Sequence, residues 1–244
     1  MSKIACEISN LEKAFGPNRV LRGIDLKLFS SEITVLMGAN GAGKSTLVKI
    51  LCGVHQPDSG NISLFGKPFK PEKPADAFRT GVVTVHQSIN DGVIPDLDVA
   101  SNLMLDQLNQ NDFGFFVNDS LMREKAQSIA QNMNLEINLK AKVSDLGIAD
   151  RQLIAIARAM TRDPKVLILD EPTSSLSAKE AERLFGVLDT LKSQGVAILY
   201  ISHRMSDIRR IADRIVTMRD GTISGIFDSK PLNFEAAVTA MLGH

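Results

Sequence analysis

The first thirty positions of the chain alternate apolar and polar residues. The alternating stretches "KIACEISNL" (3–11) and "GIDLKLF" (23–29) are separated by "GPN" (16–18), and they predict edge strands with a turn between them. The mostly apolar run "EITVLM" (32–37) predicts a buried strand. A Gly-rich loop follows it, and "KSTLVKILCGV" (44–54) has the spacing of a helix. The pattern therefore predicts a strand–loop–helix unit.

The middle of the chain changes from strand-like to helical patterning. A short strand is expected at "NISLFG" (61–66) and another at "GVVTVHQ" (81–87), whereas residues from about 96 to 162 read as helical with a loop at "NQNDFGFF" (109–116). The helix expected over 119–133 places four residues on one face: Leu121, Lys125, Ile129 and Met133.

Two short apolar runs follow, "VLILD" (166–170) and "VAILYIS" (196–202). Their β-branched character is typical of parallel strands buried on both faces. The segment between them carries a helical stripe of Ala181, Leu184, Leu188 and Leu191. This alternation predicts an α/β fold with a mainly parallel sheet. We expect one domain over 1–244, in which 1–87 and 163–244 form the sheet core with an N-terminal antiparallel β subdomain, and 88–162 form an inserted helical subdomain.

Composition narrows the functional classes. The chain has 244 residues, and 28 Lys and Arg balance 28 Asp and Glu, so charge gives no reason to expect nucleic-acid binding. The apolar runs are far shorter than the ~20 residues that a membrane-spanning helix needs, and we expect no signal peptide. Cys6 and Cys52 lack metal-site spacing and are expected to be free thiols.

The Gly-rich loop "GANGAGKST" (38–46) matches the phosphate-loop pattern G-x-x-x-x-G-K-[ST]. Glycines there let backbone N–H groups converge on phosphate oxygens, a lysine adds a point charge, and a serine hydroxyl can ligate Mg²⁺. The alternative is a Gly-rich turn with a solvated lysine. The predicted nucleotide-binding residues are Gly38, Ala39, Asn40, Gly41, Ala42, Gly43, Lys44, Ser45 and Thr46, of which Ser45 would also contact Mg²⁺.

Two acids end the buried run "VLILDEP" (166–172). A carboxylate at the end of a strand can hold the magnesium shell, which suits Asp170, and Glu171 could orient or deprotonate the attacking water. The alternative is a strand that ends in solvated acids. Two of the four histidines, His55 and His244, are expected at the surface.

The remaining histidines follow predicted strands. The role of His86 is open. His203 comes after a parallel strand, at the sheet edge where open α/β folds bind ligands, and on position alone a functional and a structural role weigh equally.

The order of these motifs resembles an ABC transporter ATPase subunit over nearly the whole chain. The resemblance implies a phosphate-loop fold of the ABC ATPase type, in which Phe15 stacks on adenine, Gln87 senses Mg²⁺ and the membrane partner, and His203 contacts the γ-phosphate. It also implies a D-loop at "SSLS" (174–177), where the family usually ends in Asp. Ser177 departs from that pattern, and with Glu180 it reads as a helix capping box.

The family's signature L-S-G-G-Q aligns with residues that we call the signature turn: Leu146, Gly147, Ile148, Ala149 and Asp150. The helix "RQLIAIARAM" (151–160) is expected to begin just after it. Gly147 lacks the hydroxyl that would bond a partner's γ-phosphate, and Ala149 adds a methyl where phosphate must come close. Asp150 puts a carboxylate near a polyanion, but we expect it mainly to cap the helix. The turn therefore reads as weakened.

Longer sequence stretches, such as "ISHRMSDI" (201–208), resemble the first ATPase half of bacterial importers for pentoses, galactose and related sugars. That resemblance implies ATP and Mg²⁺ as cofactors. The implied partners are a second ABC ATPase domain, transmembrane permease subunits and, indirectly, a solute-binding protein, with the chain at the cytoplasmic face of the inner membrane. The alternatives are a soluble ATPase acting on DNA or ribosomes and an ATP-binding regulatory module without turnover. Glu171 and His203 argue against the last.

Overall fold

The computed structural model describes residues 3–85, 92–108, 119–133, 135–161 and 163–243. Contacts divide the chain into two compact units. The first comprises Met1–Thr84, Lys165–Glu171 and Lys192–His244, and the second comprises Val85–Pro164 and Pro172–Leu191. The segment Pro172–Leu191, which the sequence-based division places with the sheet core, therefore belongs to the helical unit.

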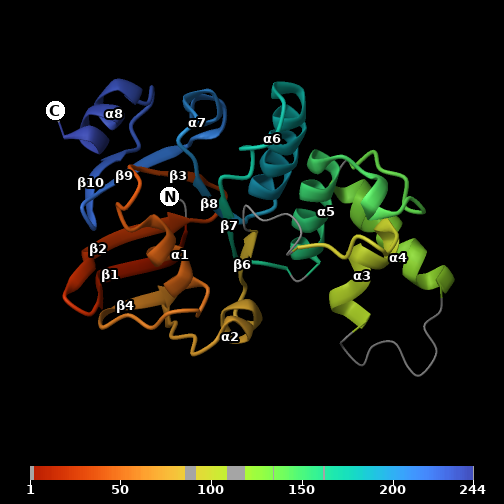
Figure 1. Ribbon diagram of the computed structural model, residues 1–244, viewed down its shortest axis with the longest axis horizontal. Helices are drawn as coiled ribbons and strands as arrows, with labels where there is room; N and C mark the ends of the chain where they lie inside the picture. The colour runs from red at the N-terminus through yellow and green to blue at the C-terminus, as the bar shows by residue number, and fades with distance from the viewer. Residues whose placement is uncertain (1–2, 86–91, 109–118, 134, 162, 244) are drawn as a thin grey trace. The chain divides into compact units, whose positions relative to one another are not determined.

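An antiparallel sheet in the first unit contains the N-terminal strands. Its order is β2-β1-β4-β5, with β1 Ile4–Phe15, β2 Asn18–Phe29, β4 Ser59–Leu64 and β5 Lys67–Pro68 (Figure 1). A two-residue turn at Gly16 and Pro17 joins β1 to β2, and Gly16 has the positive φ of 59° that such hairpin turns need. The prediction of two edge strands is wrong for β1, because β4 returns from further along the chain and pairs with its second side.

The second sheet of this unit is mainly parallel, as predicted. Its order is β10-β9-β3-β8-β7-β6, with β3 Ile33–Gly38, β6 Val82–Val85, β7 Val166–Asp170, β8 Ala197–Ile201, β9 Arg214–Arg219 and β10 Thr222–Phe227. Strands β8 and β9 run parallel to β3 on its two sides, and β10 closes the edge antiparallel to β9. The apolar runs thus occupy the middle of the sheet.

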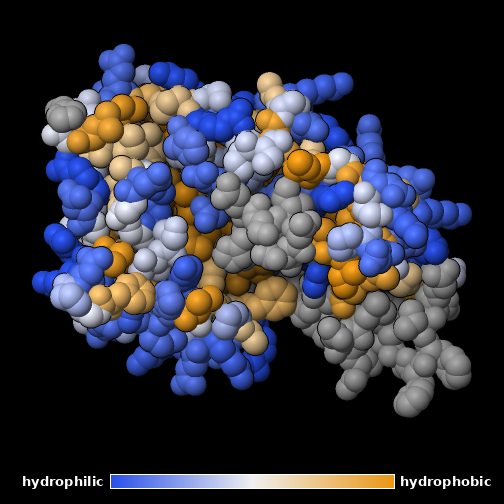
Figure 2. Space-filling view, in the orientation of Figure 1, coloured by the Kyte–Doolittle hydropathy of each residue, from blue (hydrophilic) through white to orange (hydrophobic). Residues whose placement is uncertain are grey.

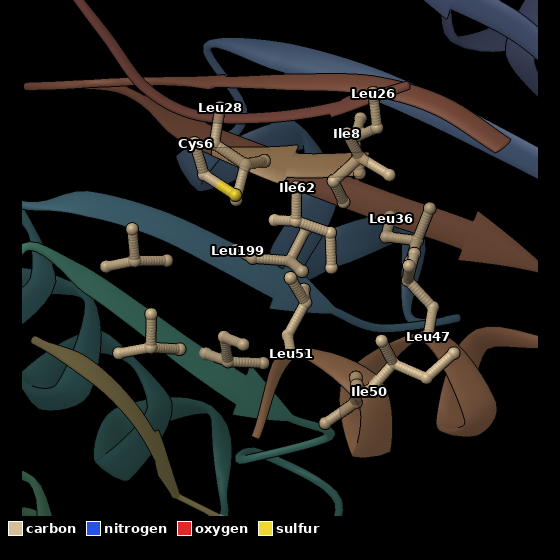
Figure 3. Close-up of a cluster of buried hydrophobic side chains, with 14 of the residues drawn as sticks. Cys6, Ile8, Leu26, Leu28, Leu36, Leu47, Ile50, Leu51, Ile62 and Leu199 are labelled. Carbon is tan, nitrogen blue, oxygen red and sulfur yellow. The ribbon is translucent and has the colours of Figure 1, made fainter. Parts of the chain in front are cut away.

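Apolar side chains from both sheets and from helix α1 (Lys44–Leu51) form one core. Figure 3 shows Ile8 and Leu28 from the antiparallel sheet facing Leu199 from the parallel sheet, with Leu51 of α1 beside them. Burial of this kind, at about 25 cal/mol per Å² of apolar surface, is the main force that joins the two sheets. Cys6 is buried here as a free thiol, and burial raises its pKa to about 12.

The second unit is helical. It contains α3 Val99–Leu108, α4 Asp119–Asn132, α5 Ile148–Met160 and most of α6 Ala178–Ser193. Helix α3 packs against both α4 and α5. Within α6, the stripe predicted from the sequence (Ala181, Leu184, Leu188 and Leu191) is buried.

The packed face of α4 is offset by one position from the face that the sequence spacing marks. Leu121 is 41% exposed, and the buried residues are Met122, Ala126, Ala130 and Met133. Three of these four residues lie one position from a member of the face that the spacing marks. Small side chains at Ala126 and Ala130 allow neighbouring helices to approach closely, and this close packing selects the face.

Three further α-helices lie among the described residues: α2 Pro74–Arg79, α7 Met205–Ile211 and α8 Phe234–Leu242. Figure 2 shows apolar side chains gathered where α8 and β10 lie, and Leu242 and Ile226 are among the large exposed apolar residues. Over the part of the chain that the structure describes, no helix combines the length and apolar character needed to cross a membrane.

Candidate functional site

The phosphate loop connects β3 to α1 in the first unit. Gly43 has a φ of 105° and is the residue before the first turn of α1. A Cβ atom at Gly43 would lie 2.8 Å from Leu21 Cδ2 and 3.1 Å from the Val20 carbonyl oxygen, and together with the positive φ this favours glycine there. Gly41 also has a positive φ, of 83°, but its Cβ position is open and the residue is exposed. The loop is thus anchored at its helical end and open at its tip, as a phosphate cradle requires.

Lys44 is the only described loop residue between 38 and 46 with a cationic side chain. Its Nζ donates to the carbonyl oxygens of Gly38 at 2.5 Å and Ala39 at 3.0 Å, so the ammonium group lies over the loop. Burial lowers the pKa of Lys44, and the negative charges of Glu171 and Asp170 oppose that shift. Ser45, the second residue of α1, is exposed. A positive charge and an exposed serine at the start of the helix fit a magnesium-bound polyphosphate.

The acids lie where β7 ends. Asp170 pairs with Ile201 of β8, and the Glu171 N–H donates to the Ile201 carbonyl at 2.9 Å. Glu171 has a φ of 47°, which is uncommon for a residue with a side chain and is a strained conformation often found at functional sites. The chain turns sharply there and directs the carboxylate away from the strand.

His203 faces Glu171 from the neighbouring strand end. Its Nδ1 lies 3.0 Å from Glu171 Oε1, and its side chain is 69% exposed. Because β7 and β8 are parallel and in register, residues just past their ends meet at one edge of the sheet. The exposed imidazole therefore orients the Glu171 carboxylate, and both groups remain open to a ligand.

Phe15, the residue expected to contact a base, ends β1 and is 45% exposed. Its ring packs against His55, with centroids 5.2 Å apart and ring planes at 68°. The sequence reasoning placed His55 at the surface without a partner, but it is half-buried and contacts Phe15. The position of His55 in the first loop after α1 was the only sequence signal that could have suggested this contact.

Several predicted residues lie outside the described part of the chain. These are Gln87, His86, the aromatic loop 109–116 and His244. The roles predicted for Gln87 in binding Mg²⁺ and sensing the membrane partner therefore stay predictions.

The signature turn, in the helical unit, is more helical than expected. Helix α5 begins at Ile148, not after Asp150, and Gly147 is its N-cap residue. The capping role expected for Asp150 is wrong, because the cap makes no side-chain hydrogen bond. Asp150 Oδ1 instead lies 3.0 Å from Arg183 Nη1 of α6. This ion pair connects α6 to α5 within the helical unit.

Arg151 holds the turn from inside. Its guanidinium donates to the carbonyl oxygens of Val143 at 3.0 Å, Ser144 at 2.7 Å and Leu146 at 3.0 Å. These three bonds hold the backbone that precedes helix α5. The expected role of Ala149 also changes, since its side chain is buried at 3% exposure.

The capping box at the start of α6 is confirmed. The Ser177 N–H and hydroxyl donate to Glu180 Oε2 at 2.8 Å and 2.6 Å, and the Glu180 N–H lies 3.4 Å from Ser177 Oγ. The Ser177 hydrogen bonds lower the pKa of the Glu180 carboxyl. The departure of Ser177 from the usual Asp therefore serves the start of this helix.

The phosphate loop, the acids and the histidine share one edge of a parallel sheet, and together they define a phosphate-loop α/β protein. The chain belongs to the ABC transporter family, whose family model matches residues 21–174. The resemblance inferred from the motifs is thereby confirmed.

Two curated relatives match nearly all of the chain. RbsA, the ribose import ATP-binding protein of Geobacillus kaustophilus, is 39% identical over 237 residues, which are 97% of this chain and 48% of RbsA. MglA, the galactose/methyl galactoside import ATP-binding protein of Treponema denticola, is 38% identical over 246 residues, covering 100% of this chain and 48% of MglA. The chain thus spans about half the length of the curated relatives it matches.

A solved structure shares the fold. It is the ADP conformation of MJ1267, an ATP-binding cassette of an ABC transporter, with a TM-score of 0.85, 23% identity and coverage of 99% of both chains. A nucleotide-free cassette from an ABC transporter matches with a TM-score of 0.82, 23% identity and coverage of 99% of this chain and 96% of the other.

Proposed function

We propose that this chain binds and hydrolyses ATP and thereby energises an ABC importer. The observation that carries the proposal is the 3.0 Å pairing of His203 Nδ1 with Glu171 Oε1, in the same compact unit as the phosphate loop. A loop that only binds phosphate needs no such oriented carboxylate. The import proteins that match this chain over nearly its whole length favour an importer over a soluble ATPase acting on DNA or ribosomes.

Bound Mg·ATP would supply the phosphoanhydride whose hydrolysis drives the cycle. The loop amides and Lys44 hold the phosphates, and the Ser45 hydroxyl and the Asp170 carboxylate hold Mg²⁺, together with Gln87 as the resemblance implies. Glu171 orients the attacking water and accepts its proton. His203 holds that carboxylate in place and is exposed enough to contact the γ-phosphate as well. Phe15 lies against adenine.

The proposed partners follow from the names of the relatives. A second ABC ATPase domain would close the nucleotide site with its own signature turn. The pair would drive transmembrane permease subunits, and a solute-binding protein would be an indirect partner through that permease. The proposed substrate class is a sugar, since the relatives are named for ribose and galactose import. The chain would then lie at the cytoplasmic face of the inner membrane, bound peripherally through its permease, with the helical insert near the contact.

Binding to membrane subunits tests this assignment against the soluble alternative. The chain is expected to co-elute with detergent-solubilised permease subunits of a sugar importer. It is expected not to bind immobilised ribosomes or duplex DNA. Membranes prepared without the permease subunits serve as the control. Retention on ribosomes or DNA, with none on the permease, would replace the importer by the soluble class.

The signature turn leads us to propose functional asymmetry between the two ATP sites of an assembled pair. This chain would hydrolyse its own ATP with a partner's turn, while its own turn would support mainly binding in the opposite site. A lone chain would then dimerise poorly and turn over slowly. The missing hydroxyl at Gly147 carries this proposal, because the N-terminus of α5 is otherwise formed and held by Arg151.

Gly147→Ser is therefore expected to raise the ATPase rate of the isolated chain. A Cβ at Gly147 meets nothing within 4 Å, so serine fits, and a hydrogen bond to a charged phosphate is worth at least about 1.4 kcal/mol, or tenfold. Steady-state phosphate release measures the effect. Gly147→Ala is the matched control, because it adds the Cβ without the hydroxyl.

Adding Ala149→Gly is less useful than the sequence suggested. It removes a buried methyl and places glycine in a first helical turn, at a cost of up to about 1 kcal/mol in the stability of the helix. If neither Gly147→Ser nor the double variant is faster, and the unmodified chain alone already reaches the rate of the full complex, the turn is not weakened.

A further inference from the structure

The rings of Phe15 and His55 meet edge to face at the end of β1. Their centroids are 5.2 Å apart with the planes at 68°, a geometry that is favourable for aromatic pairs. Phe15 is 45% exposed, so His55 covers only part of its ring. Lys13 Nζ lies over the same ring, 5.4 Å from its centroid. Phe15 is thus held from two sides while a large part of it remains accessible.

Asp58 fastens the loop that carries His55 to the end of β1. Its carboxylate accepts hydrogen bonds from the Lys13 ammonium at 2.8 Å and from the Ala14 N–H at 2.6 Å. The Asp58 N–H donates back to the Glu12 carbonyl at 2.9 Å. The side-chain contacts of Asp58 are largely solvent-exposed, but the three bonds together set the loop beside Phe15.

The same loop is attached to the helix that begins with the phosphate loop. The His55 N–H donates to the Lys49 carbonyl in the last turn of α1 at 3.1 Å. Helix α1 has eight residues and is about 12 Å long at 1.5 Å per residue. Helix α1 therefore joins the phosphate loop at its first residue to the loop that carries His55 after its last turn.

We propose that His55 is a positioning residue of the nucleobase site. It fixes the Phe15 ring in the orientation that accepts a base and provides a second aromatic wall beside it. This inference rests on the proposed function, in which Phe15 lies against adenine.

The proposal predicts that His55 affects the affinity for the base-bearing ligand only. Calorimetric titration of the full chain with Mg·ATP and with Mg·tripolyphosphate, which has no base, separates the two contributions. His55→Ala is expected to weaken ATP binding about two- to tenfold, the range of an edge-to-face aromatic pair, and to leave tripolyphosphate binding unchanged. His55→Phe keeps the ring contact and should retain most of the affinity for ATP.

Phe15→Ala, measured alongside, distinguishes the two levels of the argument. If Phe15→Ala weakens ATP binding and His55→Ala does not, the role of His55 is overturned and the base site remains. If neither variant changes ATP binding, the base site of the proposed function is wrong as well. An equal loss for ATP and tripolyphosphate in His55→Ala would also overturn the proposal, because His55 would then act through α1 and the phosphate loop.

Discussion

Replacing Glu171 with glutamine is expected to leave nucleotide binding intact and to remove most ATP turnover in the assembled complex. The amide cannot accept the proton of the attacking water, and loss of a general base typically costs about 10²–10⁴-fold in rate. Glutamine has the same shape and can still hydrogen-bond His203 Nδ1, so the turn at the end of β7 should persist. Phosphate release under saturating Mg·ATP measures the loss, and equilibrium titration checks that binding remains.

Glu235→Gln is the matched control for this variant. Glu235 lies exposed in the first turn of α8, in the same unit, and neutralising it changes the net charge equally. It should leave the rate unchanged. A near-normal ATPase rate in the Glu171→Gln complex would exclude Glu171 as the base.

Lys44→Ala is expected to weaken Mg·ATP binding by one to two decades. The lost contact is a hydrogen bond to a charged group, worth on the order of 1.5–3 kcal/mol. The Lys44 ammonium donates to the Gly38 and Ala39 carbonyls, so it lies within the loop proposed to receive the phosphates. Titration calorimetry or a fluorescent nucleotide measures the affinity.

The pH dependence gives a second check on Lys44. Because burial lowers the pKa of Lys44, the ammonium loses its proton at a lower pH than an exposed lysine does. ATP affinity should therefore be complete at neutral pH and begin to fall on the alkaline side before ordinary lysines titrate. Lys49→Ala, which alters an exposed lysine of the same helix, is the control. Unchanged ATP affinity in Lys44→Ala would remove the phosphate-loop assignment.

The sequence alone determined the features that depend on short stretches of chain. The phosphate loop needs glycines and a lysine at set spacings, and those residues are adjacent along the chain. The buried strands β7 and β8 appear as apolar runs because both faces of a parallel sheet are covered. The box of Ser177 and Glu180 spans one helical turn, so its residue types are sufficient to predict it.

Pairings between distant segments could not be read from the chain. Strand β9 (Arg214–Arg219) was not assigned from the sequence. It pairs with β3, which lies about 180 residues earlier in the chain, so no local pattern marks the pairing. The packed face of α4 could not be chosen from its periodicity, because the choice depends on which side chains let the neighbouring helix approach. Such choices are made by packing between elements, which local periodicity does not encode.

The candidate site shows the same division. The sequence identified Glu171 and His203 separately, but only the parallel register of β7 and β8 brings them within 3.0 Å. It could not show that Asp150 pairs with Arg183 or that His55 packs against Phe15. Residue types at fixed spacing determine local geometry because a few bonds separate them. Contacts across tens of residues depend on how whole elements pack, and therefore only the tertiary structure decided them.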